Sequence, residues 1–229
     1  GSGLVGSEMC IRDRACALFL AVFSFSGQLP YNFQKASILT YVIYLIARPV
    51  TQLYSTPEKS PITSWAYSIL GQIYVVLPLA LLGVWGYKSD YQLFMNTEYL
   101  LMALFVFVWT NDTGAYIVGC TLGKHRLFER ISPKKSWEGF FGGLAFCIIL
   151  ASLANYIIPG MLSTAQWIGM GILTSIFSTW GDLCESLLKR TAGVKDSGKI
   201  LPGHGGILDR FDSELIASPV IFIYLTFVL

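Results

Sequence analysis

Charged residues are scarce in this chain of 229 residues. Asp, Glu, Lys and Arg make up 13% of the sequence, hydrophobic residues make up 54%, and the mean hydropathy is +0.57. An ordinary soluble domain carries about 25% charged residues. The composition therefore argues against a soluble globular protein and indicates a membrane protein that crosses the bilayer several times.

Features of nucleic-acid-binding proteins and of metal-binding cysteine motifs are also lacking. The net charge is only +2, and no basic run is interleaved with aromatic residues, so binding to nucleic acid is excluded. The five cysteines show neither CxxC spacing nor a Cys/His metal pattern. We interpret them as small buried hydrophobic residues, and they imply no disulfide framework.

The amino-terminal end differs in composition from the rest of the chain. Residues 1–14 are polar and lack the apolar core of a signal peptide, so we interpret them as a tag, an adapter or a mis-joined end without function. The apolar segment 15–25 is too short to span a bilayer alone, and the natural amino-terminal helices are expected to be truncated. Residues 15–229 are predicted to form a single transmembrane domain.

Long apolar segments define the predicted fold. A spanning helix needs about 20 mostly apolar residues. Two shorter segments, 37–50 and 215–229, are expected to span with help from their flanks. Four segments meet the length, at 65–86, 98–119, 139–158 and 165–186. We therefore predict an all-α, polytopic membrane bundle of about six to seven spanning helices.

Lysine and arginine are concentrated in two loops, which gives the orientation. Ten of the sixteen basic residues lie in the stretches 120–138 and 187–214. Two predicted helices separate these loops, so both loops face the same side of the membrane. Basic loops mark the cytoplasmic side, and the charged chemistry is therefore expected to face the cytoplasm.

Two acidic residues fall inside predicted spanning segments, Asp112 and Asp182. An acid at the centre of a spanning helix costs about 2.5 to 3.5 kcal/mol unless it is paired or faces a polar cavity. Pairing with a lysine or arginine of a neighbouring helix is the structural alternative. We favour a functional site for both residues.

A polar stripe follows Asp182 along its helix. Residues three, four and seven apart share a face, so Asp182, Glu185, Ser186 and Lys189 are predicted to line up at the cytoplasmic end of the helix. The stripe leads into the charged, glycine-rich stretch 186–213. That stretch contains Lys195, Asp196, Lys199, His204, Asp209, Arg210 and Asp212.

Converging carboxylates without clustered Cys or His are ligands for hard cations such as Mg²⁺, which commonly uses one or two carboxylates, water and substrate phosphates. The lysines and arginines nearby would hold the remaining phosphate oxygens. The stretch therefore predicts a magnesium and polyphosphate site at a membrane surface. A solvated loop with scattered ion pairs is the alternative, but it does not explain the clustered glycines and His204.

The basic loop at 120–138 has a different character. Pro133 breaks a helix, Lys134 and Lys135 offer two cations, and Ser136 is placed to cap the next helix. Helix starts favour anions, so this loop is a candidate second phosphate contact. A positive anchor on the cytoplasmic side would look much the same.

These residues resemble those of a known family, the phosphatidate cytidylyltransferases or CDP-diacylglycerol synthases. The family signature runs S-x-x-x-K-R, then K-D, H-G-G and D-R-x-D. The segments WGDLCES, NDTGAYIVG and ISPKKSWEGFFGG also resemble the family, so the likeness covers residues 37–229. The signature is matched in order by Ser186, Lys189, Arg190, Lys195, Asp196, His204, Gly205, Gly206, Asp209, Arg210 and Asp212.

The resemblance implies a reaction of CTP with phosphatidic acid that yields CDP-diacylglycerol and pyrophosphate. It implies Mg²⁺ as cofactor, with a second cation left open, and CTP, phosphatidic acid and the lipid bilayer as partners, with a homodimer left open. The expected location is the bacterial inner membrane, with the active site facing the cytoplasm.

The resemblance also implies roles for individual residues. Asp182 and Asp209 are the leading metal ligands, with Asp212 and Glu185 as additional or supporting ligands. The residues expected to bind the nucleotide or support its pocket are Asn111, Asp112, Lys134, Lys135, Ser136 and Glu138. The residues expected in catalysis are Asp182, Lys189, Arg190, Lys195, Asp196, His204, Asp209, Arg210 and Asp212.

Two other functions remain as alternatives. A transporter would also place acids in the membrane, but the two related halves typical of many transporters are not visible in the sequence. A cytidylyltransferase acting on another lipid phosphate shares every feature above. A CDP-alcohol phosphotransferase is excluded, because its DGxxAR pattern is missing.

Overall fold

The computed structural model describes residues 31–54, 61–85, 97–194, 196–197, 206 and 208–228. The segment 1–14 and the predicted site residues Lys195 and His204 lie outside these ranges. Contacts within the chain divide it into two units, Gly1–Glu98 and Tyr99–Leu229. The single domain predicted over residues 15–229 stays a prediction, and each unit is described by itself.

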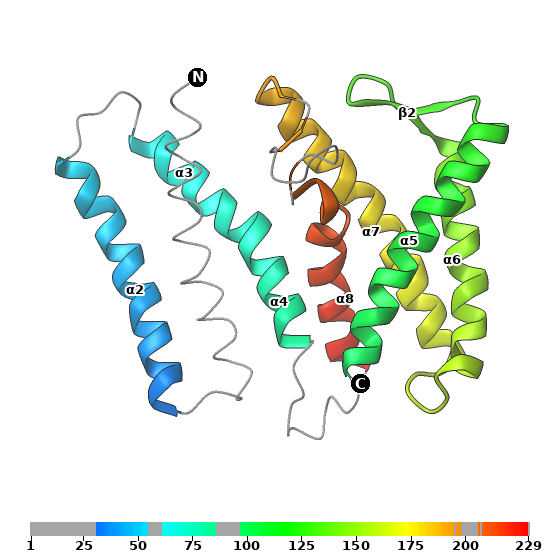
Figure 1. Ribbon diagram of the computed structural model, residues 1–229, viewed down its shortest axis with the longest axis horizontal. Helices are drawn as coiled ribbons and strands as arrows, with labels where there is room; N and C mark the ends of the chain where they lie inside the picture. Colours follow the sequence, from blue (N-terminus) through cyan, green and yellow to red (C-terminus); the bar gives the residue numbers. More distant parts are fainter. Residues whose placement is uncertain are drawn as a thin grey trace. The chain divides into compact units, whose positions relative to one another are not determined.

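The first unit consists of helices. Proline favours the first turn of a helix, where its missing N–H has no partner to lose, and Pro61 opens the second of these helices. A π-helical turn follows. Pro78 lies just after this turn and has no N–H to donate a regular helical hydrogen bond. The elements are α2 (Tyr31–Tyr54), α3 (Pro61–Gly71), the π turn η1 (Gln72–Val76) and α4 (Leu77–Trp85) (Figure 1).

The π turn is linked to α2 by an amide side chain. Gln72 is buried, and its Oε1 accepts a hydrogen bond of 2.8 Å from the Tyr41 hydroxyl. Its Nε2 donates to the Tyr44 hydroxyl oxygen at 3.3 Å. Because a buried amide needs such partners, these bonds fix α2 against the turn.

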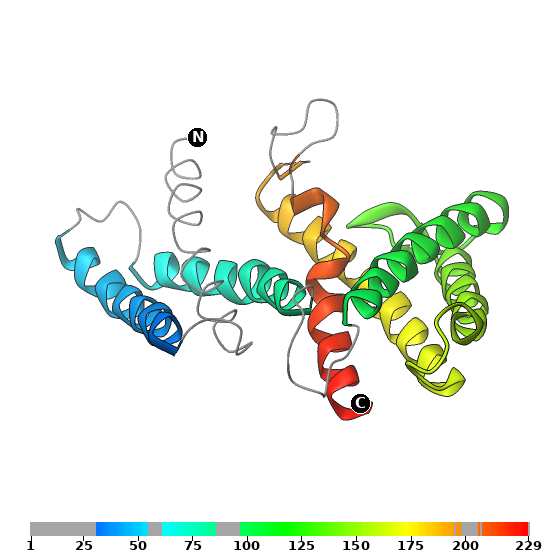
Figure 2. The same ribbon diagram turned by 60° about the horizontal axis from the view of Figure 1, so that its bottom comes forward.

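The second unit contains the charged loops. In Figures 1 and 2, α7 runs beside both α6 and α8, which agrees with the contacts between these helices. A two-stranded antiparallel sheet joins α5 to α6. The elements are α5 (Thr97–Leu122), β1 (Arg126–Phe128), β2 (Ser132–Ser136), α6 (Trp137–Ile157), α7 (Thr164–Thr191), the 3₁₀ turn η3 (Leu208–Arg210) and α8 (Glu214–Val228).

Capping residues set where α6 and α7 begin. The Ser136 hydroxyl accepts a hydrogen bond of 3.1 Å from the Gly139 N–H, so the predicted cap of α6 is confirmed. Ser163 and Gln166 form a reciprocal capping box at the start of α7. After α7 the chain turns at Gly193, whose φ of 70° is readily adopted by glycine.

Helices α5 and α6 approach each other closely where glycines replace side chains. A Cβ atom built on Gly142 would lie 2.5 Å from the Val118 side chain, and one on Gly114 would lie 2.8 Å from Phe146 Cγ. Such distances are below any real carbon contact. Small residues that let helix backbones approach are typical of packing within membranes.

The predicted helical fold is confirmed. Among the described residues, three helices are long and apolar enough to cross a membrane, over Trp65–Gly83, Glu98–Leu122 and Trp137–Ile157, and α8 is a shorter apolar helix. The count of six to seven spans stays a prediction. The loop 120–138, in which Pro133 was expected to interrupt a helix, contains the short β1–β2 hairpin, which was not predicted.

Candidate functional site

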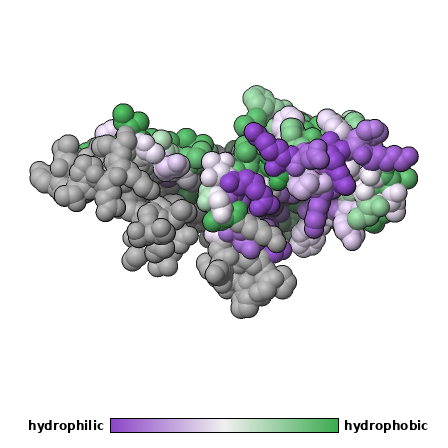
Figure 3. All heavy atoms as spheres, turned by 90° about the horizontal axis from the view of Figure 1, so that it is seen from above, coloured by the Kyte–Doolittle hydropathy of each residue, from purple (hydrophilic) through white to green (hydrophobic). Residues whose placement is uncertain are grey.

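Hydrophilic side chains gather at one end of the second unit (Figure 3). This end carries the β1–β2 hairpin and the last turns of α7 (Figure 1). Many large apolar side chains are exposed on the described helices. The predicted site residues of the hairpin and of the last turns of α7 therefore lie at this polar end.

The stripe predicted on α7 is confirmed. The Ser186 hydroxyl donates to Asp182 Oδ1 over 3.2 Å, and Lys189 Nζ lies 2.5 Å from Glu185 Oε2. Both pairs are four residues apart, the spacing that brings side chains together on a helix. Their environments differ, because the Glu185 side chain is 1% exposed and the Asp182 side chain is 33% exposed.

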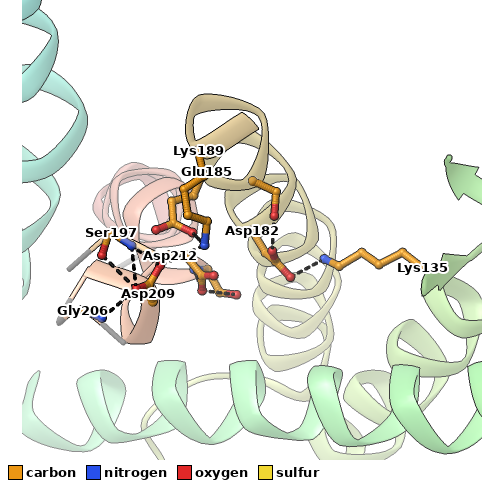
Figure 4. Close-up of polar contacts among 10 residues, drawn as sticks. Lys135, Asp182, Glu185, Lys189, Ser197, Gly206, Asp209 and Asp212 are labelled. Carbon is orange, nitrogen blue, oxygen red and sulfur yellow. Dashed lines mark hydrogen bonds and ion pairs between the residues drawn. The ribbon is translucent and has the colours of Figure 1, made fainter. Parts of the chain in front are cut away.

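The Asp209 carboxylate accepts hydrogen bonds from three segments of the chain. Lys189 Nζ donates to its Oδ1 at 2.9 Å, from the end of α7. Its Oδ2 accepts from the Ser197 N–H and hydroxyl, both at 2.9 Å, and from the Gly206 N–H at 2.7 Å (Figure 4). Both carboxylate oxygens are therefore occupied by donors of the protein.

The donors also determine the ionisation of Asp209. Partial burial opposes the charged form, but the hydrogen bonds from Lys189, Gly206 and Ser197 outweigh it and hold the pKa of this carboxyl well below its usual range. A permanently charged carboxylate with four donor groups around it is suited to fixing the glycine-rich stretch against α7.

A second ion pair connects the basic hairpin to α7. Lys135 Nζ, on β2, lies 2.7 Å from Asp182 Oδ2, and the two side chains are 27% and 33% exposed (Figure 4). The basic loop 120–138 is therefore joined to α7 at the Asp182 carboxylate. Asp182 is paired with a lysine, as the structural alternative to a site would require, but the pair is open to solvent.

Two further carboxylates lie close to this pair. Asp112, on α5, is within electrostatic range of Lys135, Asp182 and Asp212. Asp212, between η3 and α8, interacts with Asp182, Lys135 and Lys189 in the same way. Burial, and then the charge of Asp182, raise the pKa of Asp212. We call Asp112, Asp182, Asp212 and Lys135 the acidic centre.

The carboxylates at this end suit Mg²⁺ only as an ion that keeps water and substrate phosphates among its ligands. Among the described residues, no group of three or more His, Cys, Asp or Glu side chains is placed to hold a metal ion. Asp182 and Asp212 are partly exposed carboxylates that face a common region. They suit an ion that takes one or two carboxylates and completes its shell with water and substrate phosphates. Asp209 and Glu185 fit less well. Asp209 accepts from four donor groups, whereas Asp182 has one hydroxyl and one ammonium, and Glu185 is fully buried.

Three of the predicted nucleotide-binding residues have structural partners instead. Asn111 is 2% exposed and bonds to α7. Glu138 accepts from the Lys124 N–H at 3.1 Å, and its Oε1 lies 2.6 Å from His125 Nδ1, so it ties the hairpin to α6. Ser136 caps α6. Nucleotide binding by these three residues stays a prediction.

The other predicted residues lie on the surface of the same end. Lys134 and Asp112 are exposed, and so are Arg190, Asp196 and Arg210. Their positions near the acidic centre suit contact with a ligand from water. Their roles in catalysis or nucleotide binding remain predictions.

Several residues at this end were not predicted. Ser197 and His125 gain their roles only through contacts with Asp209 and Glu138, and no local pattern announces these contacts. Ser175, Ser178 and Thr179 contact Asn111. Their spacing of three and four along an otherwise apolar helix is a signal that could have indicated a polar face.

Relatives with curated names are similar to this chain. The phosphatidate cytidylyltransferase of Staphylococcus aureus (strain COL) is 41% identical over 160 residues. Those of Staphylococcus haemolyticus (strain JCSC1435) and Staphylococcus epidermidis (strain ATCC 12228 / FDA PCI 1200) are 41% and 40% identical over 159 residues. Each match covers 69% of this chain and 61% of the relative, so the chain spans less than two thirds of these proteins.

A family model, described as the cytidylyltransferase family, matches residues 5–228. The match begins within the segment 1–14 and includes both charged loops and every helix described above. With most of its length matched in this way, the chain belongs to the cytidylyltransferase family.

Proposed function

We propose that this chain transfers the cytidylyl group of CTP to phosphatidate and releases pyrophosphate. The observation that carries the proposal is the contact of Lys135, from the basic hairpin, with Asp182 on α7, in the acidic centre that also includes Asp212. Carboxylates and cations held together at the polar end of apolar helices suit a reaction between a water-soluble triphosphate and a lipid phosphate. The names of the relatives, which are phosphatidate cytidylyltransferases, support the same reaction.

The proposed chemistry needs little help from a base. An oxygen of the phosphatidate phosphate attacks the α-phosphorus of CTP, the bond from this phosphorus to the bridging oxygen breaks, and pyrophosphate leaves with the bonding electrons. The nucleophile is already an anion, so no strong base is required. The main barrier is the approach of several negative charges, and catalysis is then mostly positioning and electrostatic stabilisation.

The cations of the chain would offset these charges. Lys135 is held near the α7 carboxylates by Asp182. Arg190 and Arg210 are exposed on the same end of the second unit, where guanidinium groups can bind phosphate with two parallel hydrogen bonds. Lys189 is engaged by Glu185 and Asp209, so we assign it first to holding the loop and only second to phosphate binding.

Dependence on magnesium belongs to the proposal. We assign Asp182 and Asp212 as its carboxylate ligands, and place Asp212 ahead of Asp209 because protein donors already occupy both oxygens of Asp209. When bound, Mg²⁺ would neutralise charge on the CTP phosphates. The proposed location is the bacterial inner membrane, with the acidic centre facing the cytoplasm, where CTP is present.

The direct test is the transfer of label from radioactive CTP to a lipid extract by the purified full chain in detergent micelles. Phosphatidate is present or omitted, and Mg²⁺ is present or replaced by EDTA. We expect labelled lipid only when both phosphatidate and Mg²⁺ are present. A further arm replaces phosphatidate by a polyprenyl phosphate. Label in that arm alone would identify another lipid acceptor, and no label in any arm would contradict the proposal.

A matched pair of variants connects the activity to the acidic centre. Asp182→Asn removes the charge that pairs with Lys135 of the hairpin, and Glu129→Gln removes an exposed charge from the hairpin turn. We expect the first change to abolish label transfer and the second to leave it near the wild-type level. Equal activity of the two variants would contradict a role of the acidic centre in the reaction.

A further inference from the structure

The most complete buried polar network in the described residues lies between α5 and α7. At its centre is Asn111, whose side chain is fully buried. Its Oδ1 accepts a hydrogen bond of 2.6 Å from the Ser175 hydroxyl. Its Nδ2 donates to Ser178 Oγ at 3.2 Å and to Thr179 Oγ1 at 3.4 Å. An asparagine amide has two N–H donors and one carbonyl oxygen, and all three groups have partners here.

The directions of these hydrogen bonds agree with one another. The Ser178 and Thr179 hydroxyls donate to the Ser175 carbonyl oxygen, at 3.2 Å and 2.9 Å, so their oxygens are free to accept from the Asn111 amide. The Ser175 hydroxyl donates in the opposite direction, to Asn111 Oδ1. With the amide reversed, the Ser178 and Thr179 hydroxyls could not donate both to the amide and to the Ser175 carbonyl. The network therefore has one consistent arrangement.

Helix α6 closes the network on its remaining side. A Cβ atom on Gly143 would lie 2.5 Å from Asn111 Oδ1 and 2.7 Å from the Asn111 carbonyl oxygen, so nothing larger than glycine fits there. The Cys147 thiol, one turn along α6, lies 3.4 Å from the Phe107 carbonyl oxygen on α5. Water is kept from this site, and a buried polar group without a partner would cost several kcal/mol in such an environment. The network therefore holds α5 in one rotation and one height against α7.

That rotation matters for the neighbouring residue. Asp112 follows Asn111 directly on α5, and Asp182 lies on α7 one turn beyond Ser178 and Thr179. The two carboxylates are within electrostatic range of each other and of Lys135. Successive residues of a helix point about 100° apart, so a fixed Asn111 side chain also fixes the direction of Asp112.

We propose that Asn111 is a positioning residue, whose amide clamps α5 to α7 and thereby sets the spacing of Asp112 and Asp182 in the acidic centre. This inference rests on the proposed function, because it assigns a purpose to that centre. It replaces the prediction that Asn111 contacts the nucleotide. A side chain that is buried and satisfied on three sides has no group left to offer a ligand.

The test uses variants that loosen the clamp without replacing a residue of the acidic centre. Ser175→Ala removes the shortest hydrogen bond to the amide, and Asn111→Leu removes the amide while keeping a similar volume. The matched control is Thr110→Val, since the Thr110 hydroxyl donates to the Val106 carbonyl oxygen of its own helix, at 2.7 Å. Each full-length variant is purified in detergent, and its thermal midpoint is measured first.

Two readouts separate positioning from simple stability. One is kcat at saturating CTP and phosphatidate, measured per folded enzyme. The other is the affinity for Mn²⁺ alone, followed by electron paramagnetic resonance without CTP. We expect Ser175→Ala to lower kcat and Mn²⁺ affinity by about 10- to 100-fold, the usual effect of losing a supporting contact in a metal site. Thr110→Val should leave both readouts at the wild-type level.

Each outcome decides the inference. If Ser175→Ala lowers only the thermal midpoint and keeps kcat and Mn²⁺ affinity, Asn111 has a structural role alone and the inference is overturned. If Asn111→Leu does not fold, Ser175→Ala decides by itself. Should the wild type bind Mn²⁺ but transfer no cytidylyl group, the proposed function fails, while the Mn²⁺ readout still tests the clamp. An active wild type with unaffected variants contradicts the clamp and leaves the proposed function intact.

Discussion

The Lys189 ammonium donates to Asp209 Oδ1 over 2.9 Å, although the two residues lie 20 positions apart in the sequence. The same ammonium lies 2.5 Å from Glu185 Oε2. The side chains of Lys189, Asp209 and Glu185 are 16%, 10% and 1% exposed, respectively. One ammonium therefore compensates two carboxylates in a largely buried place. Its bond to Asp209 holds the segment around Asp209 against α7.

Removing that cation is expected to destabilise the second unit. Lys189→Met leaves Glu185 buried without its partner, and breaking a buried pair in this way costs about 3 to 5 kcal/mol. The free energy of unfolding can be measured by titration with denaturing detergent, followed by tryptophan fluorescence. The double variant Glu185→Gln/Lys189→Met should recover part of the loss, because the more deeply buried carboxylate is then neutral, while Asp209 keeps its Ser197 and Gly206 donors. Equal stability of the single and double variants would contradict this account of Glu185.

Asp209→Asn is expected to fold and to lose turnover. In either orientation the asparagine NH₂ would face a donor, which is Lys189 Nζ at the Oδ1 position or the Ser197 and Gly206 N–H groups at the Oδ2 position, so the anchor between the loop and α7 would be weakened. We expect kcat to fall by about 100-fold, as for other misplaced catalytic elements. Affinity for Mn²⁺ should fall much less than in Asp182→Asn. Near-normal turnover would show that the loop does not need this anchor, and a complete loss of Mn²⁺ binding would make Asp209 a direct ligand after all.

The helices and the α7 stripe were predictable because each follows from a simple period. Apolar length indicates a spanning helix, and the spacing of Asp182 from Ser186, or of Glu185 from Lys189, places each pair on one face. The predicted cap at Ser136 rested on equally local chemistry. These features need no knowledge of which helix packs against which.

The roles of Asn111 and Asp209 could not be predicted, because they depend on packing. A polar residue in an apolar helix has the same appearance in the sequence whether it faces a ligand or another helix. Only the position of α7 shows that the Asn111 amide is fully used. For Asp209, the signature indicated a site residue, but the contacts with Ser197 and Gly206 cross a stretch that has no periodic pattern.

The hairpin that joins α5 to α6 was missed for a related reason. Pro133 correctly indicated that a helix could not continue, but the strands are only three and five residues long, and the second carries Pro133 itself. Strand prediction relies on runs of β-branched and aromatic residues, which are absent here. The pairing is stabilised by Glu138 and His125 at its base.

Loss of Lys135 should affect activity more than stability. Its pair with Asp182 is partly exposed on both sides, and such pairs contribute about 0 to 1 kcal/mol to folding. The ammonium is nevertheless the cation paired with Asp182, where negative charge would build up in the proposed reaction. We expect Lys135→Met to lower kcat/KM by more than about tenfold, with little change in the thermal midpoint. Lys124→Met, which removes an exposed cation near the hairpin, is the control, and equal activity of the two variants would argue against a role for Lys135.

Glu138→Ala should release the base of the hairpin. The Glu138 carboxylate accepts from the Lys124 and His125 N–H groups, at 3.1 Å and 3.2 Å, and stands in the first turn of α6. Without it, both amides lose their acceptor, and the helix start loses a favourable negative charge. Hydrogen exchange measured by mass spectrometry should become faster for the peptide 123–137 and unchanged for α8. The exposed Glu129→Ala serves as control, and identical exchange in both variants would contradict the anchoring role.

Gly143→Ala tests the closeness of α5 and α6 directly. The added Cβ would lie 2.5 Å from Asn111 Oδ1 and 2.7 Å from the Asn111 carbonyl oxygen. The carbonyl belongs to the backbone and cannot turn away, so one helix must shift, and overpacking of this kind costs about 1 to 3 kcal/mol. Gly71→Ala is the matched control, because a Cβ there meets nothing within 4 Å. Since Gly71 lies in a helix, its replacement should be neutral or stabilise by up to about 1 kcal/mol. Thermal midpoints in detergent should therefore fall for Gly143→Ala alone, and a midpoint equal to that of Gly71→Ala would mean that α6 does not press on Asn111 as closely as this geometry requires.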